Sequence, residues 1–127
     1  MAFPTHRLRR LRQHASLRRM VRETSLSPAD LIYPLFVTYG RDKKEQIGSM
    51  PGQFRWSVDR VVQEAREAWD LGIPAVILFG IPEEKDERGS SASDANGVVQ
   101  PAVRTLNNAL PDLMVLTDVC IEEYTSH

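Results

Sequence analysis

The sequence predicts an α/β fold with a parallel sheet, on three observations. Three short apolar segments, residues 31–37, 75–79 and 113–116, have the length and composition of buried parallel strands. Two amphipathic segments, residues 58–71 and 99–110, lie between them. Strands that alternate with helices of this length indicate βαβ units with right-handed crossovers. Three such strands form either half of a doubly wound sheet or three-eighths of a barrel. No glycine-rich turn follows the first strand, which counts against a dinucleotide-binding fold.

The predicted first strand contains a proline, and a glycine-rich segment follows it. Because Pro34 has no N–H group to donate, we expect this strand to lie at an edge of the sheet or to be interrupted there. Residues 39–53 are polar and include Gly48, Pro51 and Gly52, which together indicate a tightly turned backbone. We therefore expect residues 39–53 to form a long loop.

Both predicted helices have recognisable ends. Ser57 is a favoured N-cap residue, and Gly72 is placed to end the first helix. The second helix begins near Val99 and ends before Pro111. Their apolar residues recur at spacings of three and four: Val58, Val61, Val62, Ala65, Ala68 and Trp69 in the first, and Val99, Ala102, Val103, Leu106 and Leu110 in the second. The polar segment between the second strand and the second helix, residues 83–97, has the composition of a mobile loop.

Composition limits the class of protein. With 127 residues, 42% of them hydrophobic, the chain is long enough for one domain with a core. A single cysteine excludes an internal disulfide bond, which agrees with a reducing compartment. No apolar run approaches the roughly 20 residues that a membrane-spanning helix needs. We therefore expect a cytoplasmic protein with no membrane partner.

The first 22 residues are strongly basic, although the net charge of the chain is only −1. They contain seven arginines and no acidic residue. Three interpretations are open: an organellar presequence, an arm that binds nucleic acid, or a basic extension that packs on another subunit. The third is favoured, with the apolar side chains Leu8, Leu11, Leu17, Met20 and Val21 as anchors. Neither His6 nor His14 has neighbours that suggest a ligand role. The predicted division is an arm at residues 1–30 and an α/β portion at 31–127.

Most of the reactive side chains follow the third predicted strand. Thr117, Asp118 and Cys120 lie where that strand ends, and reacting groups of parallel α/β folds lie at the C-terminal ends of strands. Asp118 and Cys120 are two residues apart, so in an extended backbone both side chains point to the same side. The sequence therefore predicts a site that includes this acid and this thiol.

The chain resembles the porphobilinogen synthase family, also called δ-aminolevulinic acid dehydratase. The matching stretches are LSPADLIYPLFV at 26–37, SMPG at 49–52, SVD at 57–59, GIPAV at 72–76, LFG at 78–80, TDVC at 117–120 and YTSH at 124–127. They occur in the order and spacing of the family and cover nearly the whole chain. The resemblance implies a TIM barrel, here its first three strands and two helices, preceded by an extended arm that wraps a neighbouring subunit in a homo-oligomer, usually an octamer.

The resemblance also implies a reaction, the condensation of two molecules of 5-aminolevulinate into porphobilinogen for haem and chlorophyll synthesis. Asp118 then corresponds to an active-site carboxylate near the reacting amines. Cys120 corresponds to the first thiolate of the catalytic zinc site of zinc-dependent members. Those members have a second cysteine where this chain has Glu122. Cys120 and Glu122 are thus the predicted metal ligands, and the metal is either zinc or magnesium.

One departure from the family concerns the amines that react with the substrates. The family uses two lysines late in the barrel to form Schiff bases. This chain has only Lys43, Lys44 and Lys85, all in polar segments, and none matches either position. We therefore expect the chain to be an N-terminal portion of the enzyme that is inactive by itself. The alternative is a non-enzymatic half-barrel that binds full-length subunits; a nucleic-acid partner is not expected, because no recognised binding motif is present.

Overall fold

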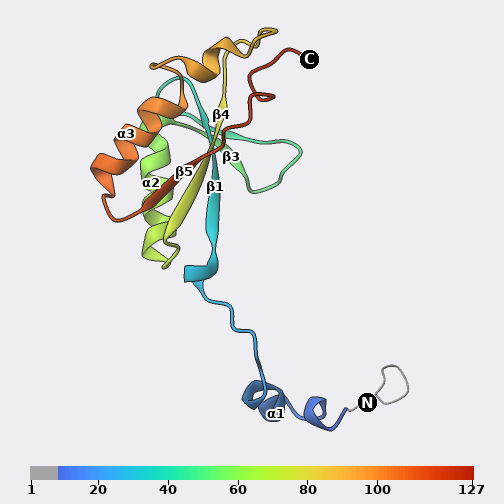
Figure 1. The fold of residues 1–127 in the computed structure, drawn as a ribbon. Coiled ribbons are helices and arrows are strands. Elements are labelled where there is room, and N and C mark those ends of the chain that lie inside the picture. The colour runs from blue at the N-terminus through green and yellow to red at the C-terminus, as the bar shows by residue number, and fades with distance from the viewer. Residues whose placement is uncertain (1–8) are drawn as a thin grey trace.

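The computed structural model describes residues 9–127, and the predictions for His6 and Leu8 lie outside that range. One five-stranded sheet has the order β2-β3-β1-β4-β5. The strands are β1 (Ile32–Thr38), β2 (Lys44–Gln46), β3 (Phe54–Ser57), β4 (Ala75–Ile81) and β5 (Met114–Thr117). The main helices are α2 (Val58–Asp70) and α3 (Val99–Ala109), which lie together on one face of the sheet (Figure 1).

The predicted βαβ units are confirmed. Strand β1 pairs in parallel with β4, and β4 pairs in parallel with β5, so both helical connections are crossovers. The apolar residues expected at helical spacing form the contact with the sheet: Val61, Ala65, Ala102 and Leu106 are fully buried. On the facing strands Leu35, Val37, Val76 and Leu78 are buried against them. Each such aliphatic side chain contributes about 1.5–3 kcal/mol on burial.

The prediction of a plain loop at residues 39–53 was wrong. Strand β2 lies within it and pairs antiparallel with β3, which in turn pairs in parallel with β1. Hydrophobicity did not indicate β2, because all three of its residues are exposed. Lys44 lies over the rings of Phe54 and Trp56, at 4.4 Å and 4.8 Å from their centroids, and this cation–π contact fastens β2 to β3.

The prediction that the strand with Pro34 lies at an edge of the sheet or is interrupted there was wrong for the strand as a whole, although the pairing beside Pro34 is one-sided. Strand β1 is central, with β3 on one side and β4 on the other. However, β3 pairs only with Phe36, Val37 and Thr38 of β1, whereas β4 pairs along the whole of it. Pro34 therefore has a neighbouring strand on one side only, and its missing donor is tolerated there.

The ends of α2 show how local sequence sets its limits. At its C-terminus Gly72 has φ of +88°, and the N–H groups of Gly72 and Ile73 donate to the carbonyls of Trp69 and Ala68. This is a Schellman motif, as a glycine at that position predicts. At its N-terminus Ser57 is the N-cap residue, but its hydroxyl does not cap the helix. It is fully buried and accepts a hydrogen bond from the Lys43 N–H at 2.9 Å instead.

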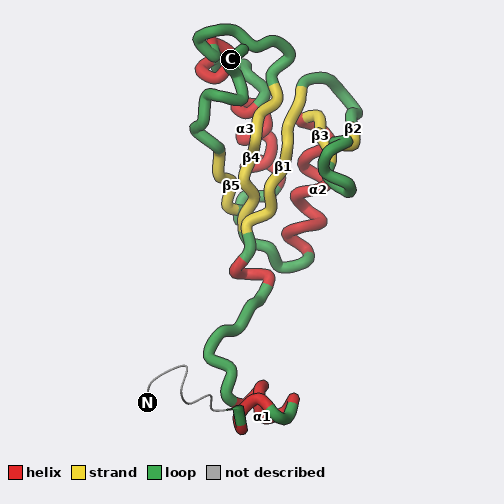
Figure 2. Tube along the Cα trace, turned by 90° about the vertical axis from the view of Figure 1, so that its right-hand side faces the viewer, coloured by secondary structure: helices red, strands yellow, loops and turns green. Residues whose placement is uncertain are grey.

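Residues 9–30 lie apart from the sheet, beyond the N-terminal end of β1 (Figures 1 and 2). They contain one short α-helix, α1 (Ala15–Met20), and two 3-10 helices, Arg10–Arg12 and Pro28–Asp30. The N-cap residue of α1, His14, accepts a hydrogen bond from the Ser16 N–H. Large apolar side chains are exposed here, including Met20 and Leu26 at 81% and 78%. No helix within residues 9–127 has the length and apolar character to cross a membrane.

The Tyr33–Glu64 hydrogen bond, 2.7 Å from the phenol oxygen to the carboxylate, joins β1 to α2 and yields a test. Burial, and then the Glu64 carboxylate, raise the pKa of Tyr33 to about 12. A raised pKa means that this contribution to stability is complete below pH 10 and is lost as the pH rises through 12. We expect Tyr33→Phe to lower the free energy of unfolding by about 1 kcal/mol at pH 8. In denaturant titrations the difference from wild type should shrink as the pH rises from 10 through 12; an unchanged difference would contradict the assignment.

Candidate functional site

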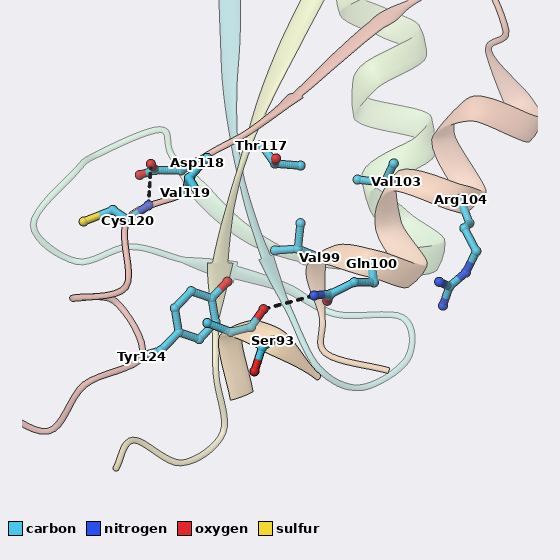
Figure 3. Close-up of a pocket in the computed structure, with 11 residues that line it drawn as sticks. Ser93, Val99, Gln100, Val103, Arg104, Thr117, Asp118, Val119, Cys120 and Tyr124 are labelled. Atoms are coloured by element: carbon cyan, nitrogen blue, oxygen red, sulfur yellow. Dashed lines mark hydrogen bonds between the residues drawn. The ribbon is translucent and has the colours of Figure 1, made fainter. Parts of the chain in front are cut away.

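The predicted site residues lie at the C-terminal end of β5, as expected. Strand β5 ends at Thr117, and the Asp118 N–H donates to the Leu78 carbonyl of β4 at 3.2 Å. The Asp118 carboxylate then accepts the Cys120 N–H at 3.0 Å, which closes a tight turn. In Figure 3 the Asp118 carboxylate and the Cys120 thiol both extend away from α3. The acid and the thiol thus share one side of the backbone.

A pocket of about 530 Å³ separates this turn from the first half of α3 (Figure 3). Val99, Gln100 and Val103 line it from the helix, and Asp118 and Cys120 line it from the strand end. Tyr124, which is largely buried, also lines it. The pocket opens at the end of the sheet where the parallel strands terminate, the usual position of ligand sites in this class of fold.

Negative charge gathers on the segment that follows β5. Burial raises the pKa of the Glu123 carboxyl, and the carboxylates of Asp118 and Glu122 add to the effect, while Lys85 opposes it. Burial also raises the pKa of the Tyr124 phenol, with smaller contributions from Glu123, Tyr39 and Asp118. Such a segment favours a cationic ligand, because clustered carboxylates attract positive charge and repel further negative charge.

The residues present do not make a complete metal site. Within residues 9–127 no three His, Cys, Asp or Glu side chains come close enough together to hold a metal ion. Cys120 and Glu122, the predicted ligands, are both exposed. A catalytic zinc ion normally has three protein ligands, so two such donors do not suffice. Their role as ligands stays a prediction that needs donors from elsewhere.

None of the three lysines lines the pocket. Lys43 lies 3.8 Å from Glu45, and Lys44 is held over two aromatic rings. Lys85 belongs to the connection between β4 and α3, outside the pocket. The residues that line the pocket therefore include Asp118, Cys120 and Tyr124, but no lysine whose amine could attack a carbonyl group.

Sequence reasoning missed Gln100 and Arg104 of α3 as pocket residues. The Gln100 amide donates to the Ala92 carbonyl at 3.1 Å, and the Arg104 guanidinium donates to the Ala95 carbonyl at 3.4 Å. Both lie off the apolar stripe of α3, where a polar residue ordinarily indicates contact with solvent. Tyr124 was also missed, although an aromatic residue close behind the reactive side chains was a usable signal.

Comparison with known proteins identifies relatives of this chain. A family model described as delta-aminolevulinic acid dehydratase matches residues 5–127. The delta-aminolevulinic acid dehydratase of Synechococcus elongatus is 51% identical over 125 residues, which cover 98% of this chain and 38% of that protein. The enzyme of the same name from Methanothermus sociabilis is 50% identical over 127 residues, covering all of this chain and 39% of the relative.

A solved structure agrees with these relatives. The delta-aminolevulinic acid dehydratase (porphobilinogen synthase) of Toxoplasma gondii, crystallised with the reaction product porphobilinogen, superposes with a TM-score of 0.86 at 36% sequence identity. The match covers 95% of this chain and 35% of that chain. The chain thus spans less than two-fifths of the length of these relatives.

The incomplete ligand set predicts weak metal binding by the 127-residue chain. We expect 0.1 mM Zn²⁺ to raise the midpoint of thermal unfolding by less than about 2 °C, because two exposed donors give little binding energy. Calorimetry with and without zinc measures this, and Cys120→Ser should behave like wild type. A larger rise that Cys120→Ser abolishes would show that the chain holds zinc without further ligands.

Proposed function

Since the chain belongs to the delta-aminolevulinic acid dehydratase family, we propose that it supplies part of a porphobilinogen synthase that condenses two molecules of 5-aminolevulinate. The observation that carries the proposal is the position of Asp118 and Cys120, at the end of β5 and beside a pocket. These are the residues that the family resemblance implies for the active site.

Asp118 is the residue proposed to act on the substrate. Its carboxylate lies on the same segment as Glu122 and Glu123, where burial and then the charge of Asp118 raise the pKa of Glu123. A 5-aminolevulinate molecule carries an amino group, and a nearby carboxylate can bind its ammonium form, orient it and accept the proton that must leave before the neutral amine attacks a carbonyl carbon. One oxygen of Asp118 also accepts the Cys120 N–H, which limits rotation of the carboxylate.

The complete enzyme is proposed to be a TIM barrel to which this chain contributes the first parallel strands. In support, the parallel order of β1, β4 and β5 is that of consecutive barrel strands. The sheet face opposite α2 and α3 bears apolar side chains, such as Ile32 and Met114, that are 53% and 64% exposed. Closing the barrel would bury them. The Schiff-base lysines would belong to later strands, which fits the absence of lysine from the pocket.

A metal ion and a second subunit complete the proposal. Cys120 and Glu122 are proposed to provide two ligands to zinc or magnesium, which would polarise a substrate oxygen when bound. Residues 9–30 are proposed to pack on a neighbouring subunit of a homo-oligomer. They carry six arginines and exposed apolar side chains, among them Leu11, Met20 and Leu26. We place the enzyme in the cytoplasm.

The second candidate function is a half-barrel that binds full-length subunits without catalysing a reaction. The exposed apolar sheet face is the observation that favours it, because such a face is typical of an interaction site. The two functions differ in one measurable property, the dependence of porphobilinogen synthesis on residues of this chain.

We expect the purified 127-residue chain to form no porphobilinogen from 5-aminolevulinate. The pocket has no lysine, and Schiff-base chemistry requires a neutral amine within reach of the substrate carbonyl. A colorimetric assay for the pyrrole product, with the Synechococcus elongatus enzyme as positive control, measures this. Turnover above the buffer blank would contradict the proposal.

A chimera tests the role of Asp118 directly. The chain replaces the matching segment of the Synechococcus elongatus enzyme, with which it is 51% identical, and we expect the chimera to make porphobilinogen. Asp118→Ala should lower its kcat at least about tenfold, since the loss of one charge-stabilising group typically costs more than that. Asp112→Ala is the matched control, because this exposed carboxylate precedes the same strand at its other end. An active chimera that is indifferent to Asp118→Ala would favour the binding module.

A further inference from the structure

The backbone conformation of Gly80 does not require a glycine. It lies in β4, where glycine weakens a strand, and it is not among the glycines with positive φ. The reason is space. A β-carbon at position 80 would overlap the hydroxyl oxygen of Tyr124 and lie 2.6 Å from the Cγ2 atom of Val99. The missing side chain thus creates a recess that the Tyr124 phenol occupies.

Asp86 holds the main chain of the same tyrosine. Its N–H donates to the Tyr124 carbonyl at 3.3 Å, and its carbonyl accepts the Ser126 N–H at 3.0 Å. Its carboxylate accepts the N–H groups of Arg88 and Ser90 at 2.9 Å and 3.0 Å. These last two bonds fix the loop that presents Asp86 to the C-terminal segment.

The segment between Asp118 and Tyr124 is therefore attached to β4 and its following loop at two places. At one end the Asp118 N–H donates to the Leu78 carbonyl. At the other end Tyr124 lies in the recess at Gly80, two residues further along β4. A hydrogen bond of 2.9 Å from the Tyr124 N–H to the Ile121 carbonyl closes a turn between the two attachments.

Little else holds the middle of this segment. Val119 and Ile121 are 89% and 48% exposed, and Cys120 is exposed as well. Because apolar packing is slight here, the position of the Cys120 thiol depends on the two attachments. A displacement of Tyr124 would be transmitted to the turn that carries the acid and the thiol.

We propose that Gly80 and Asp86 are positioning residues, which hold Tyr124 and thereby fix the turn that carries Asp118 and Cys120. Neither touches the proposed substrate pocket, and both act through Tyr124. The importance of this turn for catalysis rests on the proposed function. Its dependence on Gly80 and Asp86 is a property of the chain alone, so it can be tested without substrate.

Amide hydrogen exchange of the 127-residue chain, followed by NMR, is the test. We expect Gly80→Ala to accelerate exchange of the Cys120 and Tyr124 amides at least about tenfold, because the tyrosine must leave its recess. The amides of Leu35 and Val76 in the core should change less than about twofold. Gly48→Ala is the matched control, since a β-carbon at position 48 meets no atom within 4 Å.

Rescue distinguishes steric displacement from general damage. Adding Tyr124→Phe and Val99→Ala to Gly80→Ala removes the overlapping atoms, and exchange at Cys120 should return to within about threefold of the double variant Val99→Ala, Tyr124→Phe. If Gly80→Ala fails to fold, Asp86→Ala decides, with faster exchange expected at Ser126 and Tyr124. Unchanged exchange at these amides in both variants, or equal acceleration in the core, would overturn the proposal. An inactive chimera would not affect this result.

Discussion

The parallel pairing of β1 with β4, from Ile32 opposite Ala75 to Thr38 opposite Ile81, is the constraint on which the structure depends. It fixes which side chains of both strands face α2 and α3, since a shift of one residue would turn every side chain to the other face. It also brings Leu78 and Gly80 to the end of the sheet where β5 terminates. The packing of the core and the position of the candidate site thus both depend on this pairing.

Much of the fold could be predicted from the sequence because its helices and central strands bury apolar side chains at regular spacings. Val61, Ala65, Ala102 and Leu106 were expected to face the core and are fully buried. Strand β2 could not be found in this way, because Lys44, Glu45 and Gln46 are all exposed and only pairing with β3 makes them a strand. Pro34 correctly indicated a position without a second neighbouring strand, but not a strand at the edge of the sheet, because that depends on how far β3 extends along β1.

The site residues that directly follow a strand in sequence could be predicted. Those that depend on contacts between residues far apart in sequence could not. The positions of Asp118 and Cys120 after β5 followed from the strand itself. The contributions of Gly80, Asp86 and Tyr124 come from contacts between residues about 40 positions apart, for which a single sequence carries no direct signal. Likewise, the exposure of Cys120 and Glu122 and the lack of a third ligand among the described residues appear only in three dimensions.

The two edges of the described sheet differ in chemistry. Strand β2 forms one edge with Lys44 and Glu45, charged side chains that discourage a further strand. Strand β5 forms the other edge with uncharged residues and an exposed Met114. A further strand, such as the next strand of the proposed barrel, would therefore pair more readily beside β5 than beside β2, and the charges of β2 give the growing sheet a direction.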